Sequence, residues 1–311
     1  MNELPKEFVT RLRQIVPDEY QAAVFAHMSE AQPACFRVNT LLAERESVFC
    51  ELRNLGLEPE PIDGAPGFAV PAESRRILTD AEAAREGRIY IQSPSSMLPA
   101  PALDAQPGET ILDLAAAPGG KTLHLAALMN NEGMLSAVEA IKGRFHHLRA
   151  NLTRCGVSNC KTYLMDGRSV GRKCLERFDR ILLDAPCSSE ARIRADDPTS
   201  WKHWKPRKVR ACAHKQIGLI RAAWQALKPG GTLMYCTCSF APEENEAVVQ
   251  ALLEREENLS VLEIPGLPDA ALPGLAEWNG KRFAESLART RRVIPGPLWD
   301  GFYLALLHKE L

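Results

Sequence analysis

The chain has 311 residues, of which 45% are hydrophobic and 25% are charged, and its formal net charge is −1. This is the composition of a globular protein with room for one large domain and a smaller one, and it excludes a polycation. Any nucleic-acid partner must therefore be held by a local basic patch and not by bulk charge.

The first part of the chain, residues 1–80, has the pattern of a small α+β domain. The predicted elements are helices over 5–16, 18–28 and 44–56, a strand over 34–42, and a loop or small hairpin over 58–73. Gly56 ends the third helix, and the last stretch is rich in proline and glycine. A boundary between residues 75 and 90 separates this part from residues 81–311.

Short apolar runs alternate with helical segments in residues 81–311. The predicted strands lie over 110–114, 134–138, 161–165, 178–185 and 232–237, and the predicted helices lie over 121–129, 143–156 and 243–256. Such alternation is typical of an α/β fold in which a parallel sheet is covered by helices on both faces. Ligands of these sheets bind outside the carboxyl ends of the strands.

The loop after the first of these strands reads "AAAPGGK" and consists mainly of small residues, which leave room for a ligand. Its members are Ala115, Ala116, Ala117, Pro118, Gly119, Gly120 and Lys121. The loop matches neither the dinucleotide fingerprint GxGxxG nor the phosphate-binding pattern GxxxxGK[ST]. The alternative to a ligand site is a plain strand-to-helix turn.

Acidic residues follow the next three strands: Glu139, Asp166 and Asp184. A carboxylate after the second strand can accept both ribose hydroxyls of a nucleoside, and one after the third can accept an adenine amino proton. Each acid alone is more often a surface or capping residue. Together with the loop, however, the set resembles an S-adenosylmethionine site. Arg144, just after Glu139, is either a ligand contact or a solvated residue.

Two cysteines, Cys187 and Cys238, each stand just past a predicted strand. A thiolate that adds to carbon 6 of cytosine makes the poorly nucleophilic carbon 5 able to take a methyl group. This chemistry needs a nucleophilic thiol, an acid near base nitrogen 3 and a base for release. Cys238, Asp184 and Cys187 can fill these three roles. Methylation of amino groups normally uses an Asp/Asn-Pro-Pro-aromatic turn, where this chain has "DAPC".

The remaining cysteines are expected to be small buried hydrophobic residues: Cys35, Cys50, Cys155, Cys160, Cys174, Cys212 and Cys236. The odd number and scattered spacing of the nine cysteines predict neither a disulfide scaffold nor a metal site. The chain starts without an apolar signal segment, and no apolar run reaches about 18 residues. A cytoplasmic protein without a membrane partner is predicted.

Several stretches in this order resemble the Nol/Nop/Sun family of RNA 5-methylcytosine methyltransferases. They are "ILDLAAAPGGKT", "VEAIKGRFHHLRANLTRCGV", "LLDAPCSS", "YCTCSFAPEENEAVV" and "DGFYLALLHKE", and the resemblance begins at about residue 30. It implies a Rossmann-like class I methyltransferase sheet for residues 81–311, a small RNA-binding domain for residues 1–80, and S-adenosylmethionine as the cofactor.

The same resemblance implies roles for individual residues. Cys238 is the expected nucleophile, and Cys187 is expected to assist release of the methylated product. The expected cofactor site is the loop from Ala115 to Lys121 with Glu139, Asp166 and Asp184. The chain departs from the family in two places: Glu139 stands where Asp is usual, and "SSEARIRADDP" replaces a glycine-rich turn after Cys187.

Aromatic and basic residues alternate in "SWKHWKPRKVR", over 200–210. The candidate RNA contacts there are Trp201, Lys202, Trp204, Lys205, Arg207 and Lys208, because aromatic rings stack on bases while cations follow phosphates. The alternative is a loop whose tryptophan is anchored in the core. Arg37 and Asn39 in "FRVNTLL" are further candidates, and the target base must be single-stranded or flipped.

These observations predict a monomeric cytosine methyltransferase whose substrate is ribosomal RNA. Transfer RNA is the second candidate, because the motifs concern the cofactor and the cytosine more than the RNA. A DNA methyltransferase would use Cys187 as the nucleophile and leave "TCS" unexplained. A protein of another class, an RNA-binding assembly factor without activity, would show no methyl transfer to RNA.

Overall fold

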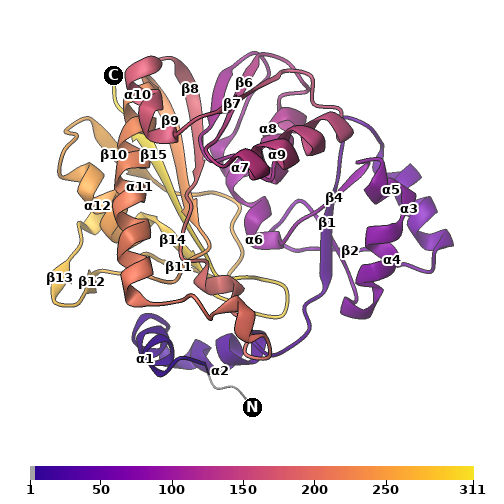
Figure 1. Ribbon diagram of the computed structural model, residues 1–311, viewed down its shortest axis with the longest axis horizontal. Helices are drawn as coiled ribbons and strands as arrows, with labels where there is room; N and C mark the ends of the chain where they lie inside the picture. Colours follow the sequence, from indigo (N-terminus) through magenta and orange to yellow (C-terminus); the bar gives the residue numbers. More distant parts are fainter. Residues whose placement is uncertain (1–3) are drawn as a thin grey trace.

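Residues 4–311, which the computed structural model describes, fold around a large and a small β-sheet (Figure 1). The strands of the large sheet are β5 (Thr110–Asp113), β6 (Met134–Glu139), β7 (Cys160–Leu164), β8 (Phe178–Asp184), β9 (Leu227–Thr237), β10 (Leu259–Leu262), β11 (Ala271–Pro273), β14 (Arg291–Val293) and β15 (Phe302–Lys309). They are arranged in the order β11-β14-β15-β9-β8-β5-β6-β7, and β10 pairs with β15.

Strands β5 to β9 run parallel, as the alternating pattern predicts. The sheet as a whole is mixed, because β15 runs antiparallel to β9 and pairs with antiparallel β10 and β14. The loop over 294–301 joins β14 to β15 and is shorter than the crossover of about a dozen residues that parallel pairing needs. The expected parallel sheet is thus corrected to a mixed sheet.

Helices cover both faces of the large sheet, which confirms the predicted α/β fold (Figure 1). One face carries α10 (Val170–Lys173), α11 (Pro206–Ala226) and α12 (Glu246–Leu253); the other carries α6 (Pro94–Met97), α7 (Pro99–Leu103), α8 (Gly120–Leu128) and α9 (Lys142–Arg154). Successive strand residues point to opposite faces, so Leu183 packs with the α11 side and Leu182 with the α7 side.

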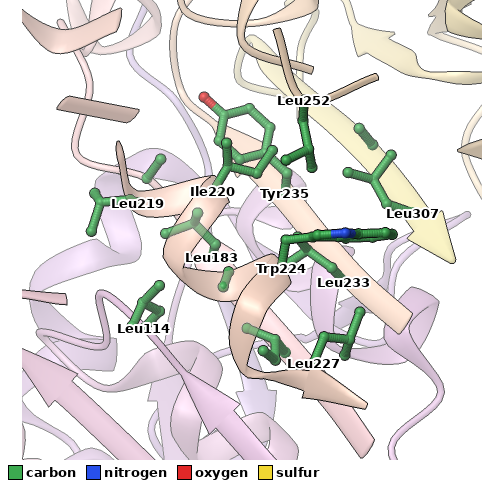
Figure 2. Packing of buried hydrophobic residues seen from close by; sticks show 14 of the residues in the cluster. Leu114, Leu183, Leu219, Ile220, Trp224, Leu227, Leu233, Tyr235, Leu252 and Leu307 are labelled. Atoms are coloured by element: carbon green, nitrogen blue, oxygen red, sulfur yellow. The ribbon is translucent and has the colours of Figure 1, made fainter. Parts of the chain in front are cut away.

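The core under α11 fixes where β8 and β9 end. Trp224 of α11 is 2% exposed and packs among Leu233, Leu252 and Leu307, which come from β9, α12 and β15 (Figure 2). Burial of each leucine contributes about 1.5–3 kcal/mol. Because the strands are held from this side, the segments that follow them leave the sheet at defined positions.

The small sheet lies beside the α7–α9 side of the molecule (Figure 1). Its antiparallel strands, in spatial order, are β2 (Glu60–Pro61), β3 (Phe68–Val70), β1 (Ala34–Val38) and β4 (Ile89–Ile91). Its helices are α3 (Arg45–Asn54), η1 (Ala72–Ser74), α4 (Arg75–Asp80) and α5 (Glu82–Arg85). The stretch over 58–73 contains the hairpin β2–β3, and the sheet extends past residue 80 because it includes β4.

The first two helices, α1 (Lys6–Ile15) and α2 (Asp18–His27), pack away from the small sheet. Phe8 of α1 stacks edge-on against Trp204 at 5.3 Å, and Arg11 forms an ion pair with Glu243 at 2.8 Å. The remaining elements are η2 (Gly167–Ser169), η3 (Glu190–Arg192), η4 (Pro198–Ser200), η5 (Glu285–Arg289) and the ribbon β12 (Glu277–Trp278)–β13 (Lys281–Arg282). Within residues 4–311, no helix combines the length and apolar character needed to cross a membrane.

Candidate active site

A cavity of about 780 Å³ lies between the two sheets, at the carboxyl ends of β5 and β8. From the predicted cofactor loop it is lined by Ala115, Ala116, Ala117, Pro118, Gly120 and Lys121. The small sheet contributes Tyr90 and Ile91 to the opposite wall. Gly120 is required there, because a Cβ atom at this position would stand 2.7 Å from the ring of Tyr90. Both parts of the chain therefore shape the cavity.

Lys121 is turned away from solvent and bonded to Asp184. It is 7% exposed, and its Nζ donates to Asp184 Oδ2 at 2.7 Å and to Ser96 Oγ at 2.6 Å. Burial disfavours the ammonium charge, but Asp184 holds the pKa of Lys121 above its usual value. The ammonium form of Lys121 is thus favoured beside Asp184, whose side chain is 34% exposed and still lines the cavity.

The two cysteines that follow β8 and β9 face each other. Cys187 Sγ and Cys238 Sγ lie 3.4 Å apart, within hydrogen-bond distance for sulfur. The strands themselves bring the loops together, since Asp184 and Cys236 are directly paired across β8 and β9. The amide of Ala191 also donates to the carbonyl of Cys238 at 3.1 Å. The expectation that the two thiols share one crevice agrees with this geometry.

The surroundings shift the pKa values of the two thiols in opposite directions. The hydrogen bond from Cys187 lowers the pKa of Cys238 against the effect of burial, and the nearby guanidinium of Arg192 lowers it further. The same hydrogen bond and burial raise the pKa of Cys187. A thiolate is the reactive form of cysteine, and within this pair the lower pKa belongs to Cys238. Arg192, in η3 and lining the cavity, is a residue that the sequence analysis missed.

Glu139, Arg144 and the loop after β5 form a second cluster. Glu139 is 3% exposed, and its Oε1 accepts the amide of Ile141 at 2.8 Å. Arg144 donates to the carbonyl of Ala117 at 2.6 Å and lies 3.6 Å from Glu139 Oε2. Arg144 therefore ties the carboxylate to the loop. Neither residue is among those that line the cavity.

Asp166 follows β7 and is bonded to its own neighbour. Both of its carboxylate oxygens accept from the guanidinium of Arg168, the shortest bond being 2.6 Å. The hydrogen bond from Arg168 lowers the pKa of Asp166. Half of the Asp166 side chain is exposed, and it lies outside the group that lines the cavity.

Asp113, at the end of β5, is a cavity residue that the sequence analysis also missed. It is fully buried; its Oδ2 accepts Thr122 Oγ1 at 2.6 Å, while its Oδ1 has no hydrogen-bond partner among residues 4–311. Burial raises the pKa of Asp113 to about 7. The only signal in the sequence was a carboxylate inside an apolar run, and a buried unpaired oxygen beside a cavity points to a ligand with a donor group.

Two of the predicted RNA contacts are buried inside the protein. Arg37 is 3% exposed and donates to Gln92 Oε1 and to the carbonyl of Gly120, each at 3.0 Å. Asn39 is 1% exposed and donates to the carbonyls of Gly87 and Cys155. The expectation of RNA contact is corrected for both residues, since they join the small sheet to its neighbours.

The stretch over 200–210 divides into anchors and a basic surface. Trp204 is 7% exposed and donates to Glu190 Oε1 at 2.8 Å, so its role as a stacking platform is corrected to that of a core anchor. Trp201 is half-buried and packs in the apolar cluster that also contains Trp204 and Phe8. The cations are exposed on or beside the start of α11: Lys202, Lys205, Arg207, Lys208 and Arg210.

All nine cysteines are free. Cys236 lies inside β9 with 0% exposure, as expected of a small hydrophobic residue, and burial raises its pKa well above the usual value. Of the other cysteines expected to be buried, Cys35 and Cys155 are buried, Cys50 is exposed on α3, and three are partly buried: Cys160, Cys174 and Cys212.

Comparison with known proteins agrees with this geometry. Residues 100–308 match the family model described as 16S rRNA methyltransferase RsmB/F. A ribosomal RNA small subunit methyltransferase F from Vibrio atlanticus is 41% identical over 256 residues, which are 81% of this chain and 54% of that protein. A protein of the same name from Cronobacter sakazakii is 38% identical over 317 residues, covering 94% of this chain and 65% of its own length.

The chain thus spans between 54% and 65% of the length of these two relatives. A solved structure, described as a methyltransferase homologue from Pyrococcus horikoshii, superposes with a TM-score of 0.78 at 31% identity and covers 99% of this chain and 100% of that one. The resemblance inferred from the sequence motifs is confirmed by these matches, as is the Rossmann-like fold.

Proposed function

Because the chain belongs to the 16S rRNA methyltransferase RsmB/F family, we propose that it transfers a methyl group from S-adenosylmethionine to carbon 5 of a cytosine in ribosomal RNA. The observation that carries the proposal is the pair of thiols, Cys187 and Cys238, whose sulfur atoms lie 3.4 Å apart near Asp184. Methylation of an amino group needs no such pair. Transfer RNA is the second candidate substrate, because these residues select a cytosine and not an RNA.

The residues at the ends of β5 and β8 that line the cavity support binding of the cofactor there. S-adenosylmethionine, when bound, supplies an electrophilic methyl group. The small side chains from Ala115 to Ala117 leave room for it, and the unpaired Oδ1 of Asp113 matches an ammonium donor. We assign the ribose hydroxyls to Glu139 and the adenine amino group to Asp166, because their carboxylates follow the neighbouring strands β6 and β7.

The first step that we assign to the protein is addition of the Cys238 thiolate to carbon 6. The sulfur lone pair forms the C–S bond, and the electrons of the C5=C6 double bond make carbon 5 nucleophilic. Nitrogen 3 takes a proton as charge develops there: the ammonium of Lys121, which is hydrogen-bonded to Asp184, gives a proton to the Asp184 carboxylate as Asp184 passes one to nitrogen 3, and Lys121 is left as a neutral amine. Carbon 5 then takes the methyl group.

Release reverses the addition. A base removes the proton from carbon 5, the C–H electron pair re-forms the double bond, the C6–S bond breaks, and the thiolate returns to Cys238. The proton on nitrogen 3 returns through Asp184 to Lys121 as the double bond re-forms. We assign removal of the carbon 5 proton to Cys187, whose sulfur lies beside that of Cys238. Once Cys238 is bonded to carbon 6 it no longer carries the charge that the Cys187 thiol faces, so Cys187 can give its own proton to solvent and then act as a thiolate base of raised pKa.

The test follows labelled methyl groups and covalent bonds in two variants. Cys238→Ala should bind RNA and cofactor but form no covalent adduct. Cys187→Ala should accumulate protein joined to methylated RNA, which survives a denaturing gel because the C–S bond is covalent. Wild-type protein should transfer the label to 16S ribosomal RNA and release it.

Other outcomes identify the rival functions. An adduct with Cys238→Ala and none with Cys187→Ala would assign the nucleophile to the "DAPC" turn, as in DNA cytosine methyltransferases. Label in transfer RNA but not in ribosomal RNA would change the substrate. Absence of label from every RNA, with RNA binding intact, would indicate an assembly factor and refute the enzymatic proposal.

A further inference from the structure

The acidic stretch "EENE" after Cys238 has three buried residues, Glu244, Asn245 and Glu246, and the first of them lies under both thiol loops. Glu244 is 0% exposed and lies just before α12. The residue after each thiol, Ser188 and Ser239, is also buried, at 5% and 2% exposure. A carboxylate at this depth is held only by hydrogen bonds or by opposite charge, so its partners define what it does.

Every hydrogen bond to the Glu244 carboxylate comes from the thiol loops or from the helix behind them. Its Oε2 accepts the amide of Ser188 at 2.9 Å and the Gln216 side chain of α11 at 2.9 Å. Its Oε1 accepts the hydroxyl of Ser188 and that of Ser239, the latter at 2.9 Å. Gln216 also donates to the carbonyl of Pro186 at 3.0 Å. One carboxylate thus joins both loops.

The two loops depend on Glu244 to different degrees. The Cys238 loop has a second anchor, because Glu190 accepts the amide of Phe240 at 3.1 Å and the hydroxyl of Ser239 at 3.2 Å. The Cys187 loop is bonded to Glu244 through both the amide and the hydroxyl of Ser188. Loss of Glu244 should therefore displace Cys187 more than Cys238.

The hydrogen atoms in the cluster leave room for a proton on Glu244. Four short contacts between oxygens link Ser188, Ser239, Glu244 and Glu190, but the two serine hydroxyls supply only two hydrogens. A proton on Glu244 Oε1 supplies a third. Among residues 4–311, neither carboxylate has an ion pair with a basic side chain, and burial raises the pKa of Glu244 to about 6. Its titratable neighbours Glu190, Cys187 and Cys212 are all acids.

We infer that Glu244 is a positioning residue for the release step: its carboxyl group bonds to the residue after each thiol and holds Cys187 where it can act on the Cys238 adduct. This inference rests on the proposed two-thiol mechanism. Glu244 would then affect release of the methylated RNA more than addition of Cys238 to the base. A residue that only stabilises the fold would affect both steps equally.

The test compares Glu244→Ala, Glu244→Gln and Glu243→Ala in the full chain. Glu244→Ala should still add Cys238 to RNA but release slowly, so that turnover falls by about 100-fold and methylated covalent adduct accumulates. Glu244→Gln should release normally, because its oxygen can accept both N–H donors while its amide donates to the two serines. Glu243→Ala, which removes the neighbouring carboxylate paired with Arg11, should show no adduct.

Two results would overturn the inference. One is a Glu244→Ala protein that accumulates no covalent adduct and whose loss of turnover is fully explained by a lower melting temperature. The other is adduct accumulation in Glu244→Gln, because this variant keeps a hydrogen-bonding side chain between the two serines. If Glu244→Ala fails to fold, Ser188→Ala replaces it, since this variant keeps the backbone bond and should accumulate a smaller amount of adduct. Cys187→Ala is measured in parallel to distinguish failure of the Glu244 inference from failure of the proposed function. If Cys187→Ala accumulates no covalent adduct, the two-thiol mechanism itself is wrong.

Discussion

Replacing Cys187 with alanine should change the pH at which Cys238 attacks RNA. The variant loses the hydrogen bond that a thiol donates to the Cys238 thiolate over 3.4 Å. Hydrogen bonds to charged groups contribute about 1.5–3 kcal/mol, and S–H is a weak donor, so the lower value applies. At about 1.36 kcal/mol per pKa unit, the pKa of Cys238 should rise by about one unit. Below the midpoint, adduct formation should slow by about tenfold.

The assay uses RNA that contains 5-fluorocytidine, because fluorine cannot leave carbon 5 as a proton does and the adduct is trapped in every variant. The rate at which adduct appears on a denaturing gel is measured over a range of pH for the wild type, Cys187→Ala and Cys187→Ser. The serine variant retains a hydrogen-bond donor and should keep a midpoint near that of the wild type. Equal midpoints for the wild type and Cys187→Ala would refute the idea that the thiol contact stabilises the thiolate.

Three further predictions concern the cofactor, the RNA and stability. Glu139→Ala should weaken cofactor binding by about 1–3 kcal/mol and leave RNA binding unchanged; calorimetry with an unaltered affinity would remove Glu139 from the site. The second variant neutralises four exposed cations together: Lys202, Lys205, Arg207 and Lys208. The slope of log affinity for RNA against log salt concentration should then fall by about 0.7–0.9 for each phosphate contact that is lost. An unchanged slope would mean that these cations face away from the RNA. Burial raises the pKa of Asp113 to about 7 in the folded protein, above its value in the unfolded chain. The folded protein therefore favours the protonated carboxyl group. This contribution to the free energy of unfolding is fully present below the pKa of the unfolded chain and is lost as the pH rises through about 7. Asp113→Asn should therefore raise the melting temperature at alkaline pH while weakening cofactor binding, and a melting temperature that is equally pH-dependent in both proteins would contradict this.

The parts of the fold that depend on local periodicity could be predicted from the sequence. Strands β5 to β9 and the helices α8 and α9 carry their own apolar spacing, and the position of each strand end follows from it, whereas α10 lies where a polar turn follows β7 in the sequence pattern. The mixed character of the sheet could not be predicted in this way. The direction of β15 depends on how the loop over 294–301 connects it to β14, and the apolar run of β15 reads the same in either direction.

Prediction of individual contacts was less successful because it depends on burial. Arg37 and Trp204 are residue types that bind RNA when exposed, but here each completes a hydrogen bond inside the protein. Conversely, Asp113 and Glu244 look like ordinary acids in the sequence, and only the tertiary structure shows that they are buried and form no ion pair within residues 4–311. A sequence window reports residue type and spacing, whereas these roles depend on which segments meet in space.

The closeness of the two sulfur atoms also makes the protein vulnerable to oxidation. A disulfide bond is about 2.05 Å long, so the 3.4 Å between Cys187 and Cys238 needs to shorten by only about 1.4 Å for the bond to form. A thiolate attacks a mixed disulfide or sulfenic acid on its neighbour without any large movement of the chain. Each oxidised molecule would lose the nucleophile and the releasing base together. The fraction of competent protein in a preparation is thus set by its reductant, and thiol titration should precede any measurement of turnover.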